Sequence, residues 1–302
     1  MAEEQEGVFD RRHRALTVGA VLAVSIVAFE GLALPTVAPE IARDLDGVAL
    51  YGWIFSAFLL AQIVGAVAAG QHADRVGVAR PFIISLALFG SGLLVGSLAP
   101  SMMMLIAGRA LQGLGGGALV TCVYALINTG YPDHLRNRML AAFSSAYILP
   151  ALVGPVAAGF IAEQLSWRAV FYGFLPFLVV VGILTAPSFG RLSPPNGEKA
   201  ADEGPAHRRL SSAVALAAGT GLLLTGLSIT AGENLQVFGL EVRSVIVGPL
   251  LTGFGVLVAV PALRAVLPDG TLVARRGLPA TLAANGLLAA GYFYTETYMV
   301  LA

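Results

Sequence analysis

Two charged residues, Glu30 and Arg109, lie inside long apolar stretches of the sequence. If such a stretch crosses a membrane, a charged side chain within it costs at least about 2.5–3.5 kcal/mol and needs a partner or a water-filled cavity. A carboxyl group can take up a proton, which changes its attraction to a neighbouring guanidinium group. These residue types therefore offer proton exchange controlled by an ion pair. The alternative is a static ion pair that only holds helices together.

Counting along the chain places both groups at a similar depth. Glu30 precedes Pro39 by nine residues and Arg109 follows Met102 by seven, and Pro39 and Met102 are the predicted outer ends of their apolar stretches. At about 1.5 Å per helical residue, these depths are about 13 and 10 Å. The two groups are therefore expected at a similar height in the membrane.

The composition indicates what kind of molecule carries these charges. Of the 302 residues, 57% are hydrophobic and 12% are charged, and the mean hydropathy is +0.79. Soluble domains hold roughly 25% charged residues, so this chain has too little polar surface to cover a water-soluble globule. We expect an all-α polytopic protein of the cytoplasmic membrane, with the lipid bilayer as its solvent.

Nothing in the sequence predicts an enzyme, a metal site or a cofactor. The four histidines are scattered through polar stretches, and no nucleophile has a base at a suitable spacing. The one cysteine, Cys122, excludes an intrachain disulfide and is expected as a small buried packing residue. Because the net charge is zero, nothing points to a nucleic-acid partner.

Nine apolar runs are long enough to cross a hydrocarbon core of about 30 Å as helices. None alternates with the period of two that barrel strands show, so the spanning backbone must be helical. The runs cover residues 15–38, 50–70, 81–99, 102–129, 139–162, 168–187, 212–230, 244–266 and 278–302.

The basic residues predict the orientation of these spans. Of the 18 Lys and Arg residues, 14 fall on one side of alternating spans and three on the other, with Arg109 inside a span. Since basic residues favour the cytoplasmic side, the N-terminus is predicted to be cytoplasmic, and "inner" and "outer" below follow this prediction. The predicted organisation is an inner tail (1–14), six spans (15–187), a charged linker (188–211), two further helices (212–266) and a last helix (278–302).

The short connection GQHADRVGVARP follows the second run. Gly70 and Gly77 permit a sharp turn, and Asp74 is expected near the start of the next helix, with Arg75 at the end of the previous one. The pattern G-x-x-x-D-R-x-G resembles the signature loop of the major facilitator superfamily, in which it acts as a cytoplasmic gate latch. Two positions that are usually basic in that family hold Val and Ala here, and only Arg80 remains. A simple structural turn is the alternative.

The fourth run contains GRALQGLGGGAL. Gly113 and Gly117 are four residues apart, which lets another helix approach closely. The pattern G-R-x-x-Q-G resembles the fourth-helix motif of the same superfamily, whose arginine, at Arg109 here, is tied to proton coupling.

The fifth run contains LVGPVAAGF. Gly154 and Gly159 thin one helix face, and Pro155 is expected to kink the axis. This stretch resembles the antiporter motif G-P-x-x-G-G of the superfamily, which marks exporters. An ordinary kinked packing helix is the alternative.

Two further stretches, SWRAVFYGFLP (166–176) and LALPTVAPEIARDL (32–45), resemble the fourteen-helix drug:proton antiporter branch of the superfamily. The resemblance runs in order from residue 10 to 187. The usual acidic position of the first helix holds Ile26, and an acid appears instead at Glu30.

This resemblance implies a six-helix half of a transporter that exports small hydrophobic or amphipathic molecules in exchange for protons. The family fold makes the first and fourth helices neighbours that line a cavity, so we expect Glu30 and Arg109 to face it and pair. Protonation of Glu30 is then expected to release Arg109 and so couple proton flow to a conformational change. The candidate cavity side chains, besides Phe29, are Gln62, Gln112, Tyr124 and Tyr147.

Two competing functions and one open position remain. The resemblance makes residues 212–266 the two extra helices that this branch inserts between its halves, and 278–302 the first helix of the second half. Because the other helices of the second half are not matched, we expect a fragment whose missing C-terminal half completes the bundle. A non-transporting membrane module and an uptake symporter of the same superfamily are the competing functions. Glu296, in the last run, has flanks like those of Glu30 and is expected to lie at a comparable height.

Overall fold

The computed structural model describes residues 7–10, 13–189, 206–231, 236–237, 240–241 and 244–267. The chain divides into two compact units, Met1–Ala206 and His207–Ala302. The boundary falls inside the predicted linker 188–211, although the roles assigned to the segments on either side stay predictions. The last predicted helix, 278–302, and Glu296 lie outside the described residues.

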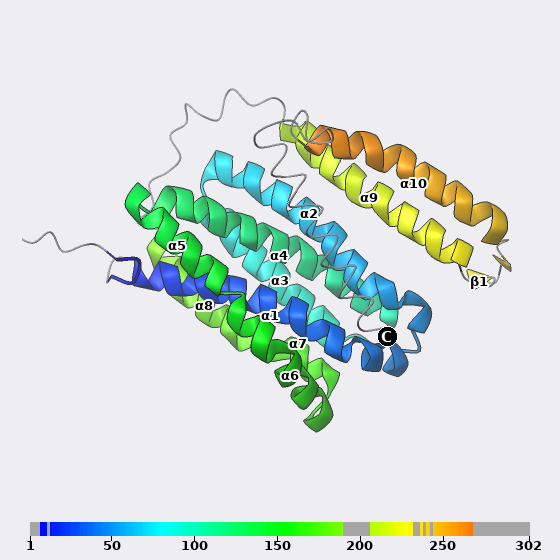
Figure 1. The fold of residues 1–302 in the computed structure, drawn as a ribbon, viewed down its shortest axis with the longest axis horizontal. Coiled ribbons are helices and arrows are strands. Elements are labelled where there is room, and N and C mark those ends of the chain that lie inside the picture. Colours follow the sequence, from blue (N-terminus) through cyan, green and yellow to red (C-terminus); the bar gives the residue numbers. More distant parts are fainter. Residues whose placement is uncertain are drawn as a thin grey trace, which may run out of the picture. The chain divides into compact units, whose positions relative to one another are not determined.

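The first unit is built from helices (Figure 1). They are α1 (Arg14–Asp44), the 3₁₀ turn Val48–Leu50, α2 (Tyr51–Val76), α3 (Ala79–Ser97), α4 (Met102–Gly130), α5 (Asp133–Ser145), α6 (Ile148–Gln164), α7 (Trp167–Tyr172) and α8 (Leu175–Phe189). Helices α5 and α6 together form one span, and so do α7 and α8. Across both units, eight helical segments of the described residues are long and apolar enough to cross a membrane, which confirms the predicted all-α polytopic class.

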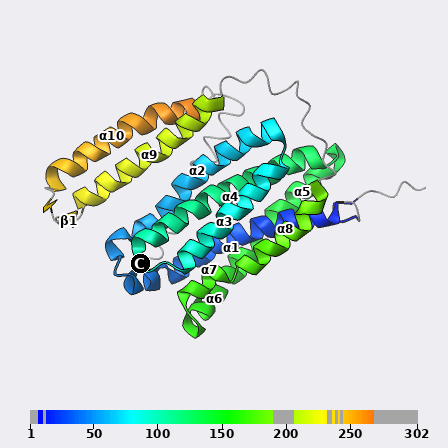
Figure 2. The ribbon, with the colours of Figure 1, turned by 180° about the vertical axis from the view of Figure 1, so that it is seen from behind.

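The six spans of this unit pack as two groups of three (Figure 1 and Figure 2). Helices α2 and α3 pack along α4, whereas α1 packs against α6 and α8. Contacts between α1 and α4 are much sparser than those of α4 with α2 and α3, or those of α1 with α6 and α8. We call the boundary where α1 faces α4 the seam.

Glycines bring α4 into backbone contact with both of its partners. A Cβ atom on Gly113 or Gly117 would overlap backbone carbonyl groups of α2, as predicted from their spacing. On another side of α4, a Cβ on Gly108 would lie 2.9 Å from the backbone nitrogen of Gly96 in α3, and one on Gly115 would overlap the backbone of Phe89. The glycine-rich stretch of α4 therefore serves two helix contacts at once.

Two spans are interrupted four residues before a proline. The fifth span breaks at Ala146–Tyr147, ahead of Pro150, and α7 ends at Tyr172, ahead of Pro176. Proline has no N–H to donate to the carbonyl group four residues earlier, and its ring crowds that group. Helix α6 continues through Pro155, and the kink expected there stays a prediction.

The outer end of α1 also differs from the prediction. The helix passes through Pro35 and Pro39 and ends at Asp44, so Pro39 does not mark the end of the span. Glu30 therefore lies fourteen residues before the helix end, near the middle of α1. The depth of Glu30 in the membrane therefore depends on the tilt of α1 and cannot be obtained by counting residues from Pro39.

The second unit contains α9 (Ala206–Ala231), a two-residue β ladder of Gln236–Val237 with Leu240–Glu241, and α10 (Ser244–Val266). Helices α9 and α10 pack closely through glycines. A Cβ on Gly226 would lie 2.6 Å from the carbonyl oxygen of Gly248, and one on Gly219 would lie 3.0 Å from that of Gly255. Each helix thus offers two glycines seven residues apart to the other.

Candidate functional site

Glu30 of α1 and Arg109 of α4 form an ion pair across the seam, from Arg109 Nη1 to Glu30 Oε1. Both side chains are 2% exposed. The pairing expected from the sequence is therefore present, between a central turn of α1 and the second turn of α4. Its part in proton coupling stays a prediction.

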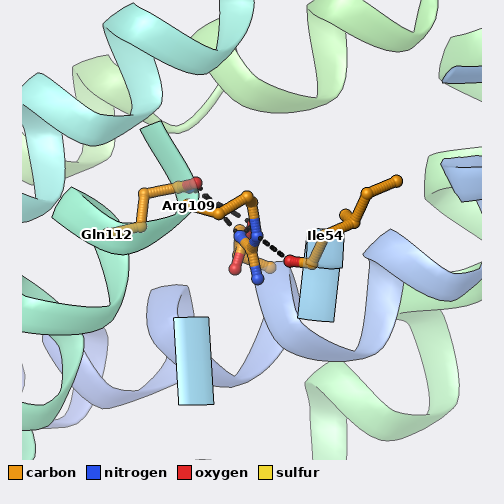
Figure 3. A network of polar contacts seen from close by, with 4 residues as sticks. Ile54, Arg109 and Gln112 are labelled. Carbon is orange, nitrogen blue, oxygen red and sulfur yellow. Dashed lines mark hydrogen bonds and ion pairs between the residues drawn. The ribbon is translucent and has the colours of Figure 1, made fainter. Parts of the chain in front are cut away.

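Arg109 has three further partners besides Glu30, and two of them, Ile54 and Gln112, are drawn in Figure 3. Its Nε donates to the backbone carbonyl oxygen of Ile54 in α2 at 3.0 Å, and its Nη1 donates to Gln112 Oε1 at 3.0 Å. The guanidinium carbon lies 4.4 Å from the centroid of the Phe58 ring, a cation–π contact. Helices α2 and α4 therefore hold the guanidinium group without help from α1.

The two carboxylate oxygens of Glu30 have different surroundings. Oε1 accepts from Arg109 and, at 3.3 Å, from Gln112 Nε2. Oε2 is buried and has no hydrogen-bond partner among the described residues. An ionised carboxylate gains most when both oxygens accept, whereas a protonated one has a single O–H to place. The free Oε2 is therefore the position at which a proton can be added without displacing Arg109.

The pair lies inside the six-span unit and not on a surface of it. Counted over the whole residue, Glu30 is 2% exposed, Arg109 1% and Gln112 fully buried. The expectation that these groups face an open cavity is therefore not met within the described residues. Water must pass between helices of this unit to reach Glu30.

The predicted gate loop is mostly helical. Gly70, Asp74 and Arg75 belong to the last two turns of α2, and Arg80 to the first turn of α3. Asp74 is thus at a helix C-terminus and not near a helix start as predicted. Gly77 makes the turn with a φ of 83°, which favours glycine. Asp74, Arg75 and Arg80 are exposed, and no ion pair within the described part of the chain involves them.

The helix with the antiporter-like motif packs along α1. A Cβ on Gly154 would lie 3.8 Å from the Phe29 carbonyl oxygen, and one on Gly159 would lie 3.5 Å from Thr36 Cγ2. These are ordinary contact distances, so neither glycine is required by the packing seen here. Pro155 is half-buried on the same helix.

The candidate cavity side chains separate into three environments. Gln112 joins the buried ion pair, while Gln62 is half-buried on α2. Tyr124 and Tyr147 are 45% and 38% exposed and flank Phe143, with ring centroids 4.6 and 5.9 Å from it.

A separate apolar cavity of about 360 Å³ lies between α1, α6, α7 and α8. Phe29, Pro150 and Phe174 are among the residues that line it. None of Gln62, Gln112, Tyr124 and Tyr147 contributes to its wall.

Sequence reasoning missed a polar cluster at the outer helix ends. Asp44 Oδ2 accepts from Trp167 Nε1 at 3.0 Å and from Arg168 Nη1 at 2.9 Å. Arg168 Nη2 also donates to the carbonyl oxygen of Ala99 at 3.2 Å. We call these four residues the outer clasp. Asp44 lies in the stretch 32–45, and Trp167 and Arg168 lie in the stretch 166–176. Both stretches resemble the same branch of the superfamily, and this was the signal from which the cluster could have been predicted.

A comparison with protein families shows which family has this sequence pattern. Residues 19–302 match the model described as Major Facilitator Superfamily. The chain belongs to this superfamily. Its relatives are transporters and not enzymes.

Several curated relatives of this superfamily member are named as multidrug or efflux transporters. It is 34% identical over 174 residues to the "Probable multidrug-efflux transporter" of Mycobacterium tuberculosis, covering 55% of this chain and 37% of that protein. It is 30% identical over 186 residues to the "Multidrug transporter protein MdtP" of Bacillus subtilis, covering 62% and 34%. The chain thus spans about a third of the length of these relatives.

A solved structure supports the fold. The crystal structure of a D-xylose-proton symporter superposes with a TM-score of 0.50 at 14% identity, over 83% of this chain and 64% of that one. At this identity the likeness concerns the fold alone.

Proposed function

We propose that the chain is part of an exporter that moves small hydrophobic or amphipathic molecules out of the cell, across the cytoplasmic membrane, in exchange for protons. The observation that carries the proposal is the buried Glu30–Arg109 pair with a free Oε2. The names of the efflux relatives support the substrate class and the direction of transport. The chain provides the proton-responsive part of such a protein.

The geometry suggests which element responds to the proton. When Glu30 is ionised, its Oε1 is held by Arg109 and Gln112, which ties α1 to α4. Protonation at Oε2 removes the negative charge and weakens this tie. Arg109 then keeps its contacts with Ile54 and Gln112, so α1 is freed while the guanidinium group stays in place. This differs from a mechanism in which the arginine is released.

Other predicted residues have supporting roles in this proposal. The exposed Asp74, Arg75 and Arg80 are available at the inner helix ends for contacts with a second half of the transporter. Tyr124 and Tyr147 present aromatic faces that suit an amphipathic substrate. The α6 motif with Gly154, Pro155 and Gly159 gives α1 a thin neighbour along which it can shift.

The test is efflux of a panel of fluorescent compounds from cells that express the full-length protein, with and without a protonophore. We expect Glu30→Gln to abolish protonophore-sensitive efflux at normal expression, because the amide cannot exchange a proton. Glu163→Gln, an identical change at an exposed site on α6, is the matched control and should transport normally. Unchanged proton-driven efflux in Glu30→Gln would refute the coupling role.

A further inference from the structure

The outer clasp joins the two helix groups of the first unit. Asp44 ends α1, and Trp167 and Arg168 begin α7. Ala99 lies in the connection from α3 to α4, which belongs to the other group. Arg168 therefore contacts both sides of the seam, through Asp44 on one side and the Ala99 carbonyl group on the other.

Several contacts fix the geometry of Arg168. Its guanidinium carbon lies 4.2 Å from the centroid of the Trp167 ring, and the indole is itself hydrogen-bonded to Asp44. Trp167 is only 1% exposed and packs edge-on against Phe171, with centroids 5.9 Å apart. The clasp thus combines a buried aromatic base with a partly exposed charged group that stacks on it.

Between the clasp and Glu30 lies a layer of buried apolar side chains. Each member is at most 3% exposed. The layer comprises Leu34, Val37 and Ile41 of α1, Ile54 of α2, and Met102 and Leu105 of α4. Water entering from the outer side toward Glu30 must separate the α1 and α4 members of this layer.

We propose that the outer clasp is a gate that controls access of external water and protons to Glu30. When closed, Arg168 holds the outer end of α1 against the α3–α4 connection, and the apolar layer stays sealed. When Arg168 leaves Asp44 or Ala99, the outer part of the seam opens and water reaches Oε2 of Glu30. Arg168 is in this sense a positioning residue, and the use of the admitted proton rests on the function proposed above.

The exposure of the clasp is consistent with a gate that opens and closes. The side chains of Arg168 and Asp44 are 35% and 47% exposed, so water competes for their hydrogen bonds. Exposed ion pairs of this kind contribute little net stability, whereas removing one partner of a buried pair is strongly destabilising. The Glu30–Arg109 pair, with both side chains 2% exposed, lacks such competition.

Cysteine labelling in lipid nanodiscs tests the gate, since a water-soluble maleimide then reaches both membrane faces. The background is the full-length protein with Cys122→Ala, which removes the chain's one native thiol. Ala38→Cys places a thiol on α1 between Glu30 and Asp44, at a position that is fully buried. We expect Arg168→Gln to raise the labelling rate of this variant at least tenfold. Arg168→Lys, which keeps the charge but cannot reach both Asp44 and Ala99 in the same way, should give a smaller rise.

The matched control is Ala20→Cys, equally buried on α1 but on the inner side of Glu30. Its labelling should not change with Arg168→Gln. Equal acceleration at both positions would mean a general loosening of the bundle and would overturn the proposal, as would an unchanged rate for Ala38→Cys. If Arg168→Gln does not fold, Asp44→Asn provides the same comparison, because it removes the charge while keeping an acceptor for Trp167.

The labelling and transport experiments test the gate and the coupling role independently. Labelling measures entry of a water-soluble reagent and does not require transport. If Glu30→Gln transports normally while Arg168→Gln accelerates labelling, the gate is supported and the coupling role of Glu30 is refuted. If Glu30→Gln abolishes proton-driven efflux while Arg168→Gln leaves the labelling rate unchanged, the coupling role is supported and the gate is refuted.

Discussion

Gly117 of α4 lies directly against Gln62 of α2, so close that a Cβ atom on the glycine would overlap the glutamine's backbone carbonyl oxygen. Gly65 of α2 makes the reciprocal approach to the carbonyl group of Leu114. The two helices thus meet backbone to backbone, and no flexible side chain is available to make room. The helix pair α2–α4 therefore forms a stiff support for Arg109, which both helices hold.

This contact predicts opposite outcomes for two glycines of similar appearance in the sequence. Gly117→Ala should lower the free energy of unfolding by about 1–3 kcal/mol, because overpacking must push α2 away. Gly159→Ala should be neutral or slightly stabilising, since its Cβ would lie 3.5 Å from Thr36. Thermal unfolding in detergent, followed by intrinsic fluorescence, gives the comparison. A larger loss for Gly159→Ala would show that the α1–α6 contact is tighter than described.

The ion pair predicts strong coupling between two substitutions. Arg109→Ala should cost about 3–5 kcal/mol, because it leaves Glu30 charged and buried without a counterion. Glu30→Gln should cost less, about 1–3 kcal/mol, since Arg109 keeps its contacts with Ile54 and Gln112. The double variant should lose clearly less than the sum of both. Unfolding measurements on all four proteins complete the cycle, and additive losses would contradict a direct interaction.

The turn between α2 and α3 predicts that replacing two glycines of one motif by alanine changes the stability in opposite directions. Gly77→Ala should destabilise by about 1–2 kcal/mol, because a φ of 83° is costly for a side chain with a Cβ. Gly70→Ala should stabilise by up to about 1 kcal/mol, because Gly70 is inside α2 and its Cβ would meet Thr121 only at 3.7 Å. Unfolding midpoints of the two variants check this, and a loss in Gly70→Ala would point to an unseen close contact.

The break in the fifth span predicts a rescue experiment. Ser25 Oγ of α1 donates to the Ala146 carbonyl oxygen at 3.1 Å, and Pro150 has no N–H to serve that group. Ser25→Ala should therefore cost about 1–3 kcal/mol by leaving a carbonyl group unsatisfied. Adding Pro150→Ala supplies a backbone donor and should recover part of the loss. Hydrogen exchange at residue 150 reports whether the new N–H is protected, and an unprotected amide would argue against the rescue mechanism.

Much of the fold follows from hydrophobic length alone. Six apolar runs predicted the six spans of the first unit, and the spacing of Gly113 and Gly117 predicted a close helix contact. The Glu30–Arg109 pair followed from the cost of isolated charges in lipid together with the family resemblance. These features depend on local composition and on one strong energetic rule, which is why the sequence carries them.

Other features depend on contacts between distant segments and were not predictable. The α1 helix continues through Pro39, whereas the fifth span breaks ahead of Pro150, where Ser25 of another helix serves the freed carbonyl group. The site's burial also depends on how α1 lies on α4, which no motif encodes. The clasp of Asp44 with Arg168 joins residues 124 positions apart.

The glycine contacts between α9 and α10 make these two helices interdependent. A Cβ atom on Gly219 or Gly226 of one helix, or on Gly248 or Gly255 of the other, would overlap the backbone of the partner helix. Removing a single helix would leave the glycines of the other without the backbone they pack against. The hairpin therefore behaves as one cassette, which evolution or an engineer can delete, transplant or exchange only as a pair.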